Sequence, residues 1–149
     1  MAKLSTVADV LERELKPLIT EWLRRVNRLP VLNHISLSDA DRADHLTSLY
    51  YDVICRLCRV EGAHASPPPI FVTAIAHGRT RQAQGYSAAM LVEESRLFEI
   101  VTFDILSLHR REFDQSKLLL DIAVIADEVD AQLTESVRSL VEAQTACVS

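Results

Sequence analysis

The chain has 149 residues, of which 48% are hydrophobic and 25% are charged, and its formal net charge is -5. This length and composition are typical of one globular domain with a hydrophobic core of its own. The acidic balance argues against a general nucleic-acid binder, because phosphate backbones are bound by basic surfaces.

The N-terminus mixes acidic and basic residues early, which is unlike a signal peptide. No apolar run approaches the roughly 18 to 20 residues that cross a bilayer. The chain has three cysteines, an odd number, which without a secretion signal indicates reduced thiols. We therefore expect a cytoplasmic protein that does not act at a membrane.

The first predicted helix runs from about Thr6 to Asn27, where apolar residues recur at helical spacing. Pro17 lies inside this pattern. Because proline removes a backbone hydrogen bond and clashes with the preceding turn, we expect it to kink or split the helix. The segment from Val31 to Leu37 is predicted to be a loop.

Ser38 is predicted to cap a second helix that continues to about Val60, with Asp41 as its capping partner. Inside this helix, Cys55 and Cys58 form a CxxC pair. A redox pair would begin a helix after a strand, and a zinc site needs further ligands, so we interpret them as two small buried residues. The stretch EGAHASPPP that follows is a predicted loop.

A third helix is predicted from about Pro69 to Gln84, with prolines in its first turn and Gly85 as its stop. A fourth helix, capped by Ser87, is predicted to reach about Arg111. No segment of the chain shows a convincing strand-like alternation. The sequence therefore predicts an all-α fold, a bundle of five or six helices, of which a globin-like arrangement is one form.

A fifth helix, capped by Asp114 or Ser116, is predicted to continue close to the C-terminus. Its apolar stripe is longer than a small bundle covers, so we expect Val137, Leu140 and Val141 to be exposed in a monomer. Burying such a side chain is worth roughly 1.5 to 3 kcal/mol. We predict a parallel homodimer that uses this helix; the alternative is that its end packs back on the first helix.

Residues 77–94 carry residue types that an ordinary helical hairpin does not need. His77 and Arg81 are four residues apart and share a helix face. If the chain turns at Gly85, Glu94 on the next helix comes within reach of both, and its removal is expected to cost about 1 to 3 kcal/mol. The cluster is either a structural salt bridge or a sensing site. The candidate ligand-binding or signal-sensing residues are His77, Arg81, Gln84, Tyr86 and Glu94.

Catalytic motifs, a phosphate-binding loop and metal-ligand spacings are not visible, so we expect no catalytic residue, no metal and no cofactor. A haem-binding or other cofactor-binding globin-like sensor is the alternative, with His77 or His109 as the axial ligand. A phosphorylatable histidine at His77 fits only loosely, because apolar residues surround it.

The motif HGxxRxxQGYS at 77–87, followed by LVxExRL at 91–97, resembles the RsbRD-type N-terminal domain. That domain precedes the output domains of stressosome co-antagonists and stands at the front of some bacterial sensor histidine kinases. Trp22 and residues 127–137 match the family's first and last helices, and Ser95 stands where the family often has an aromatic residue. The resemblance implies a non-catalytic, cytoplasmic signalling input domain, with a second copy and a kinase or regulator output domain as its partners.

Overall fold

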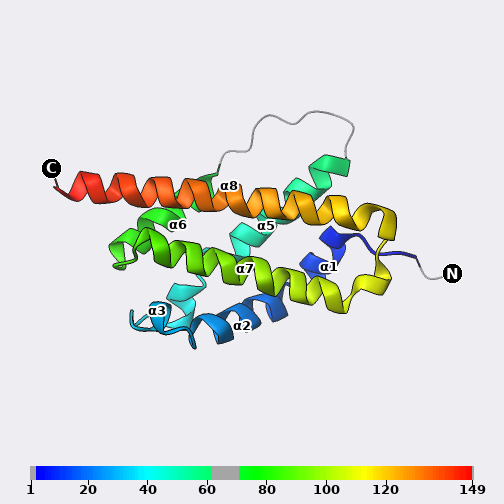
Figure 1. Cartoon of the computed structure of the whole chain (residues 1–149), viewed down its shortest axis with the longest axis horizontal. Coiled ribbons are helices and arrows are strands. Elements are labelled where there is room, and N and C mark those ends of the chain that lie inside the picture. The colour runs from blue at the N-terminus through cyan, green and yellow to red at the C-terminus, as the bar shows by residue number, and fades with distance from the viewer. Residues whose placement is uncertain (1–2, 62–70, 149) are drawn as a thin grey trace.

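The computed structural model describes residues 3–61 and 71–148 of the chain. This part of the chain is helical without a strand, so the prediction of an all-α bundle is confirmed (Figure 1). Its helices are α1 (Val7–Arg13), α2 (Leu15–Val26), α3 (Pro30–Asn33), α4 (Asp39–Arg42), α5 (Leu46–Glu61), α6 (Val72–Ala83), α7 (Ala88–Leu108), α8 (Gln115–Val148) and the 3-10 turn η1 (Arg110–Glu112). Most of the predicted EGAHASPPP loop, and the proline-rich start expected for α6, lie outside the described residues.

Proline positions explain why the first part of the chain has more helices than expected. The predicted first helix is split at Glu14, three residues before Pro17, as the missing N–H of that proline requires. The prediction of a loop from Val31 is wrong for its first residues, because these belong to α3, in which Pro30 occupies the first position. Proline suits that position, since the first N–H groups of a helix have no intrahelical acceptor.

The second predicted helix is wrong as a single element. Ser38 caps α4 as expected, with its hydroxyl accepting from the N–H of Asp41 at 3.1 Å. However, α4 ends at Arg42, and α5 begins only at Leu46. Because carbonyls at a helix end have no partner within the helix, this break leaves carbonyl oxygens of α4 free to accept bonds from elsewhere.

The turn between α6 and α7 has the predicted form. Gly85 adopts φ 91°, a conformation that favours glycine, and the N–H of Tyr86 returns to the carbonyl of Arg81 at 2.9 Å. The hydroxyl of Ser87 then caps α7 by accepting from the N–H of Met90 at 3.3 Å. At the next turn, the carboxylate of Asp114 accepts from the N–H of Ser116 at 3.0 Å.

Helices α7 and α8 run antiparallel along the length of the molecule, with α2 on the other side of α7 and α6 beside the C-terminal half of α8 (Figure 1). The core between them is built from large side chains that are fully buried, among them Leu11, Leu18, Trp22, Tyr50 and Ile125. Among the helices in the described ranges, none is long and apolar enough to cross a membrane.

The C-terminal half of α8 corrects a prediction. Leu140 is fully buried and Val137 is half-buried, so only Val141 of the three expected residues is exposed within the single chain. The covering element is α6, not the first helix: the hydroxyl of Ser136 donates to the carbonyl of Ala74 at 2.9 Å. The last residues of α8 extend beyond α6 and α7 (Figure 1).

Candidate functional site

A buried ion pair joins α6 to α7. The Nε of Arg81 donates to Oε1 of Glu94 at 2.7 Å, and a terminal nitrogen donates to Oε2 at 3.0 Å. The two side chains are only 1% and 4% exposed. Two parallel bonds of this kind match the planar guanidinium to a carboxylate, so both groups are held in one geometry. The predicted contact between Arg81 and Glu94 is confirmed.

The remaining donors of Arg81 bind the end of its own helix and one further element, α4. One terminal nitrogen donates to Oε1 of Gln84 at 2.7 Å, and the other to the backbone carbonyl of Arg42, which the break after α4 leaves free. The guanidinium also lies over the ring of Tyr86, 4.8 Å from its centroid. Four of the five candidate residues therefore meet around Arg81, namely Arg81, Gln84, Tyr86 and Glu94.

A second buried arginine, Arg42, belongs to the cluster and was not predicted. It is 3% exposed, and its terminal nitrogens donate to the hydroxyl of Tyr86 at 2.8 Å and to the carbonyl of Ile35 at 2.7 Å. Its Nε is buried and has no acceptor in the described part of the chain. The signal in the sequence was its spacing from Leu46 and Leu49, which places an arginine in line with an apolar stripe.

The cluster carries an excess positive charge. Arg42 and Arg81 are two buried cations, and the one buried carboxylate beside them, Glu94, is paired with Arg81. Burial raises the pKa of Glu94, while the charges of Arg81 and Arg42 act in the opposite direction. Burial, together with the charge of Glu94, also raises the pKa of Tyr86 to about 12, so its phenol stays protonated and accepts from Arg42 through a neutral oxygen.

His77, the fifth candidate, contacts another histidine instead of Glu94. Its Nδ1 lies 3.4 Å from Nδ1 of His45, and the two rings meet edge to face with centroids 5.4 Å apart. Burial lowers the pKa of His77 to about 3, and the charge of Arg81 adds to the effect. His77 is therefore neutral at pH 7. Of the predicted cluster of His77, Arg81 and Glu94, the contact between Arg81 and Glu94 is present, while His77 contacts His45 and lines the same cavity as Glu94.

A small cavity of about 40 Å³ lies beside this cluster. At about 10 to 15 Å³ for each water, it has room for about three. Its apolar wall includes Trp22, Leu49, Leu91, Phe98 and Leu133. Its polar lining consists of Arg42, His77, Glu94, Ser95, Gln132 and Ser136. Gln132, Leu133 and Ser136 come from α8, so the long helix forms one side of the cavity.

Trp22 ties a further helix to this site. Its indole N–H donates to the backbone carbonyl of Glu94 at 3.2 Å, and the ring is buried against the cavity. Trp22 therefore has a structural role in addition to its resemblance to a family position. It fixes α2 to the turn of α7 that carries the buried carboxylate.

Another buried carboxylate, Glu128, lies on α8 outside the cavity. One of its oxygens is 3.9 Å from a terminal nitrogen of Arg56, and the other has no hydrogen-bond partner in the described residues. Burial raises the pKa of Glu128 to about 7, against the opposing charge of Arg56. This carboxyl is therefore partly protonated near neutral pH.

The other chemistry-bearing residues do not converge on a site. His109 pairs with Glu112, and Cys55 and Cys58 are exposed on α5, so the interpretation of the two cysteines as buried residues is wrong. Within residues 3–61 and 71–148, no three His, Cys, Asp or Glu side chains gather in a metal-binding arrangement. The cavity beside His77 is far smaller than the several hundred Å³ that organic cofactors occupy, so the residues present there do not fit a haem.

Comparison with protein-family models, curated proteins and solved structures finds no match to this chain.

Proposed function

We propose that this chain is a non-catalytic, cytoplasmic signalling input domain of the RsbRD N-terminal type. In this proposal, α8 carries the state of the domain to a kinase or regulator output domain. The observation that supports it is the position of α8: this helix of 34 residues forms one side of a cavity whose other side is a buried charged cluster. A change in the cavity would act directly on the packing of α8.

The crossing of α6 and α8 supports this coupling. A Cβ atom at Gly78 would lie 2.1 Å from the backbone oxygen of Ser136, so the two helices meet backbone to backbone at this point. The hydroxyl of Ser139 also donates to the carbonyl of Ile75 at 2.9 Å. Gly78 is one helical turn before Arg81, so a shift of the ion pair moves the surface on which α8 lies. Packed helices of this kind respond by small sliding motions between discrete arrangements.

The chemistry of the site also supports a binding and signalling role more than a catalytic one. The charged atoms of the ion pair are occupied by each other, and His77 has its pKa lowered to about 3, too far from neutrality for efficient proton transfer at pH 7. A group held this tightly stabilises a conformation.

A homodimer is part of the proposal, with a corrected interface. The large apolar side chains that α8 exposes are Leu119, Leu120, Val141 and Val148, and these replace the buried Leu140 as candidates for contact with a second copy. Paired α8 helices would pass a rotation or a shift to paired output domains.

The test is a chimera in which α8 continues into the dimerisation helix of a histidine kinase core, with autophosphorylation as the output. Glu94→Gln and Gly78→Ala should each change the rate several-fold, because both alter the contacts that place α8. Glu93→Gln, a change on the same helix at a side chain that is 35% exposed and pairs with Arg96, is the control. An output that is the same for all four proteins, over several lengths of the junction, would contradict the proposal.

A further inference from the structure

The cavity beside the ion pair is lined by a charged side chain with an unpaired hydrogen-bond donor. Arg42 lines it, and the Nε of Arg42 is buried without an acceptor in the described residues. A buried donor that bonds neither protein nor solvent is costly, and the cost is larger when the group is charged. An occupant of the cavity that accepts a hydrogen bond would remove this cost.

The carboxylates near Arg42 do not supply that acceptor. Both oxygens of Glu94 bond to Arg81, which leaves the charge of Arg42 without an ion-pair partner in the described ranges. The nearest carboxylates in the sequence, Asp39, Asp41 and Asp44, are all exposed, and the first two accept from Asn27 and Ser38. His77 is neutral, so Arg42, Arg81 and Glu94 together carry a surplus of one positive charge beside the cavity, which Arg42 and Glu94 both line. Water satisfies a donor but does not neutralise a charge.

The size and the walls of the cavity restrict what fits. About 40 Å³ accommodates roughly three water-sized groups, which corresponds to three or four non-hydrogen atoms. The lining combines the polar side chains of Arg42 and Ser95 with the apolar rings of Trp22 and Phe98. An occupant with an anionic end and a small apolar end matches both kinds of lining.

We infer that this cavity is a binding site for a monocarboxylate of one or two carbons, the size of formate or acetate, held by the Nε of Arg42 with its apolar end toward Trp22. The inference names the class of ligand for the proposed signalling domain. The signalling role of that ligand rests on the proposed function. The carboxylate accepts from Arg42, and its carbon end contacts the ring that already fixes α2 to α7. Because Gln132 and Leu133 of α8 face the same space, the occupant contacts the helix that the proposal assigns to output.

Binding is measurable with the protein's own fluorophore, because Trp22 is the only tryptophan in the chain and lines the cavity. Sodium formate and sodium acetate are titrated through the millimolar range at constant ionic strength, since so small a ligand binds weakly. Acetamide is the neutral control of nearly the same shape as acetate, and sodium chloride is the control for an anion without a carbon end. The expected result is a saturable change in Trp22 emission with the carboxylates alone.

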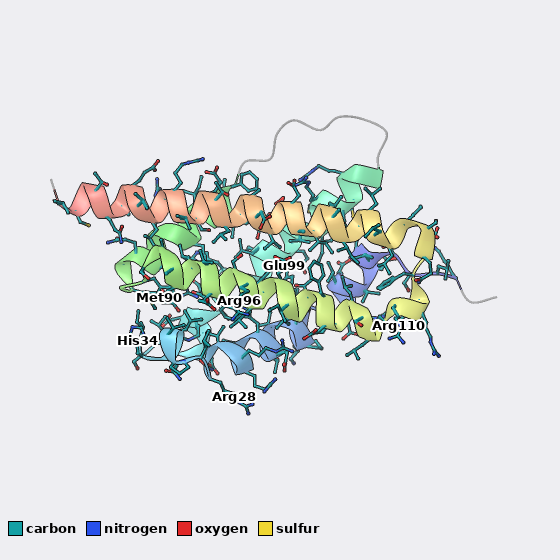
Figure 2. The ribbon with its side chains drawn as sticks, in the orientation of Figure 1. Arg28, His34, Met90, Arg96, Glu99 and Arg110 are labelled. Atoms are coloured by element: carbon teal, nitrogen blue, oxygen red, sulfur yellow. The ribbon has the colours of Figure 1, made fainter. Side chains whose placement is uncertain are left out.

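Variants locate the site. Arg42→Gln should weaken acetate binding at least tenfold, whereas Arg28→Gln should leave it unchanged; Arg28 is exposed at the edge of the molecule (Figure 2). Arg42 also bonds Tyr86 and Ile35, so a second variant guards against a loss of folding. Ser95→Leu fills the cavity and keeps Arg42, and it should abolish the response while the circular dichroism spectrum stays helical. A nuclear Overhauser effect from the acetate methyl group to the Trp22 indole should appear in the wild type.

Several results would overturn the inference: no saturable response to any carboxylate, an equal response to acetamide or chloride, or equal losses in Arg42→Gln and Arg28→Gln. The first of these would mean that the cavity holds water only. Acetate binding that leaves autophosphorylation of the kinase chimera unchanged would contradict the proposed function and support the ligand class. If the domain binds no carboxylate but Gly78→Ala still changes autophosphorylation of the chimera, the ligand class is contradicted and the proposed function is supported.

Discussion

Removing the carboxylate of Glu94 tests the physical basis of the site most directly. In Glu94→Ala, the guanidinium of Arg81 keeps its charge but loses both of its carboxylate bonds, at 2.7 and 3.0 Å, in a position that is 1% exposed. Breaking a buried ion pair by removing one partner costs about 3 to 5 kcal/mol, because the other charge stays buried without compensation. That is more than the 1 to 3 kcal/mol expected from a hydrogen bond alone. It is a large share of the roughly 5 to 15 kcal/mol by which a domain is stable.

The assay is urea unfolding at pH 7, followed by circular dichroism at 222 nm. Glu93→Ala is the matched control, since Glu93 is the neighbouring residue and bonds Arg96 at 2.9 Å, with side chains that are 35% and 52% exposed. An exposed pair of this kind contributes about 0 to 1 kcal/mol. The two glutamates differ in burial, so the difference between the two losses measures what burial adds.

The double variant Arg81→Met with Glu94→Leu separates charge from packing. It removes both charges, and we expect it to be more stable than Glu94→Ala by at least about 1 kcal/mol, because no uncompensated charge remains. Its carbonyl partner at Arg42 loses a donor, so full recovery is not expected. The reasoning is refuted if Glu94→Ala loses less than about 1 kcal/mol, or if the double variant is the less stable protein.

Three further outcomes follow from single features of the structure. Gly78→Ala should lose more than about 2 kcal/mol in urea unfolding or displace α8, because its Cβ would lie 2.1 Å from the oxygen of Ser136; a loss under 1 kcal/mol would show that the helices do not cross so closely. The pKa of Glu128, raised from 4.5 to about 7, means that the folded state binds the extra proton, so the stability from this group is present below pH 4.5 and lost as the pH rises through about 7. Glu128→Gln should flatten that dependence and gain up to about 3 kcal/mol at pH 8 over wild type, at 1.36 kcal/mol for each pKa unit; an equal slope in both proteins would contradict it. In light scattering, wild type should have the mass of a dimer, and Leu119→Glu with Leu120→Glu should give a helical monomer; a wild type that stays monomeric at high concentration argues against the dimer.

The sequence by itself determined most of the helices and one part of the site. Hydrophobic periodicity and capping residues act within a few residues of each other, so Ser38, Ser87 and Asp114 begin helices where expected, and Gly85 ends one. A short turn then fixes the register of two antiparallel helices. That register is why the contact between Arg81 and Glu94 was predictable from spacing alone.

Tertiary structure alone decided the rest, because it depends on residues that are far apart in the chain. Spacing shows that Arg42 follows an apolar stripe, but its burial results from a helix break and from Tyr86, 44 residues away. Likewise, His77 meets His45 across 32 residues. Leu140 is covered because Gly78 lets α6 approach α8, a contact that a one-dimensional pattern does not contain. Local hydrogen bonding specifies a helix, whereas the partner of each helix face is chosen by the packing of the whole chain.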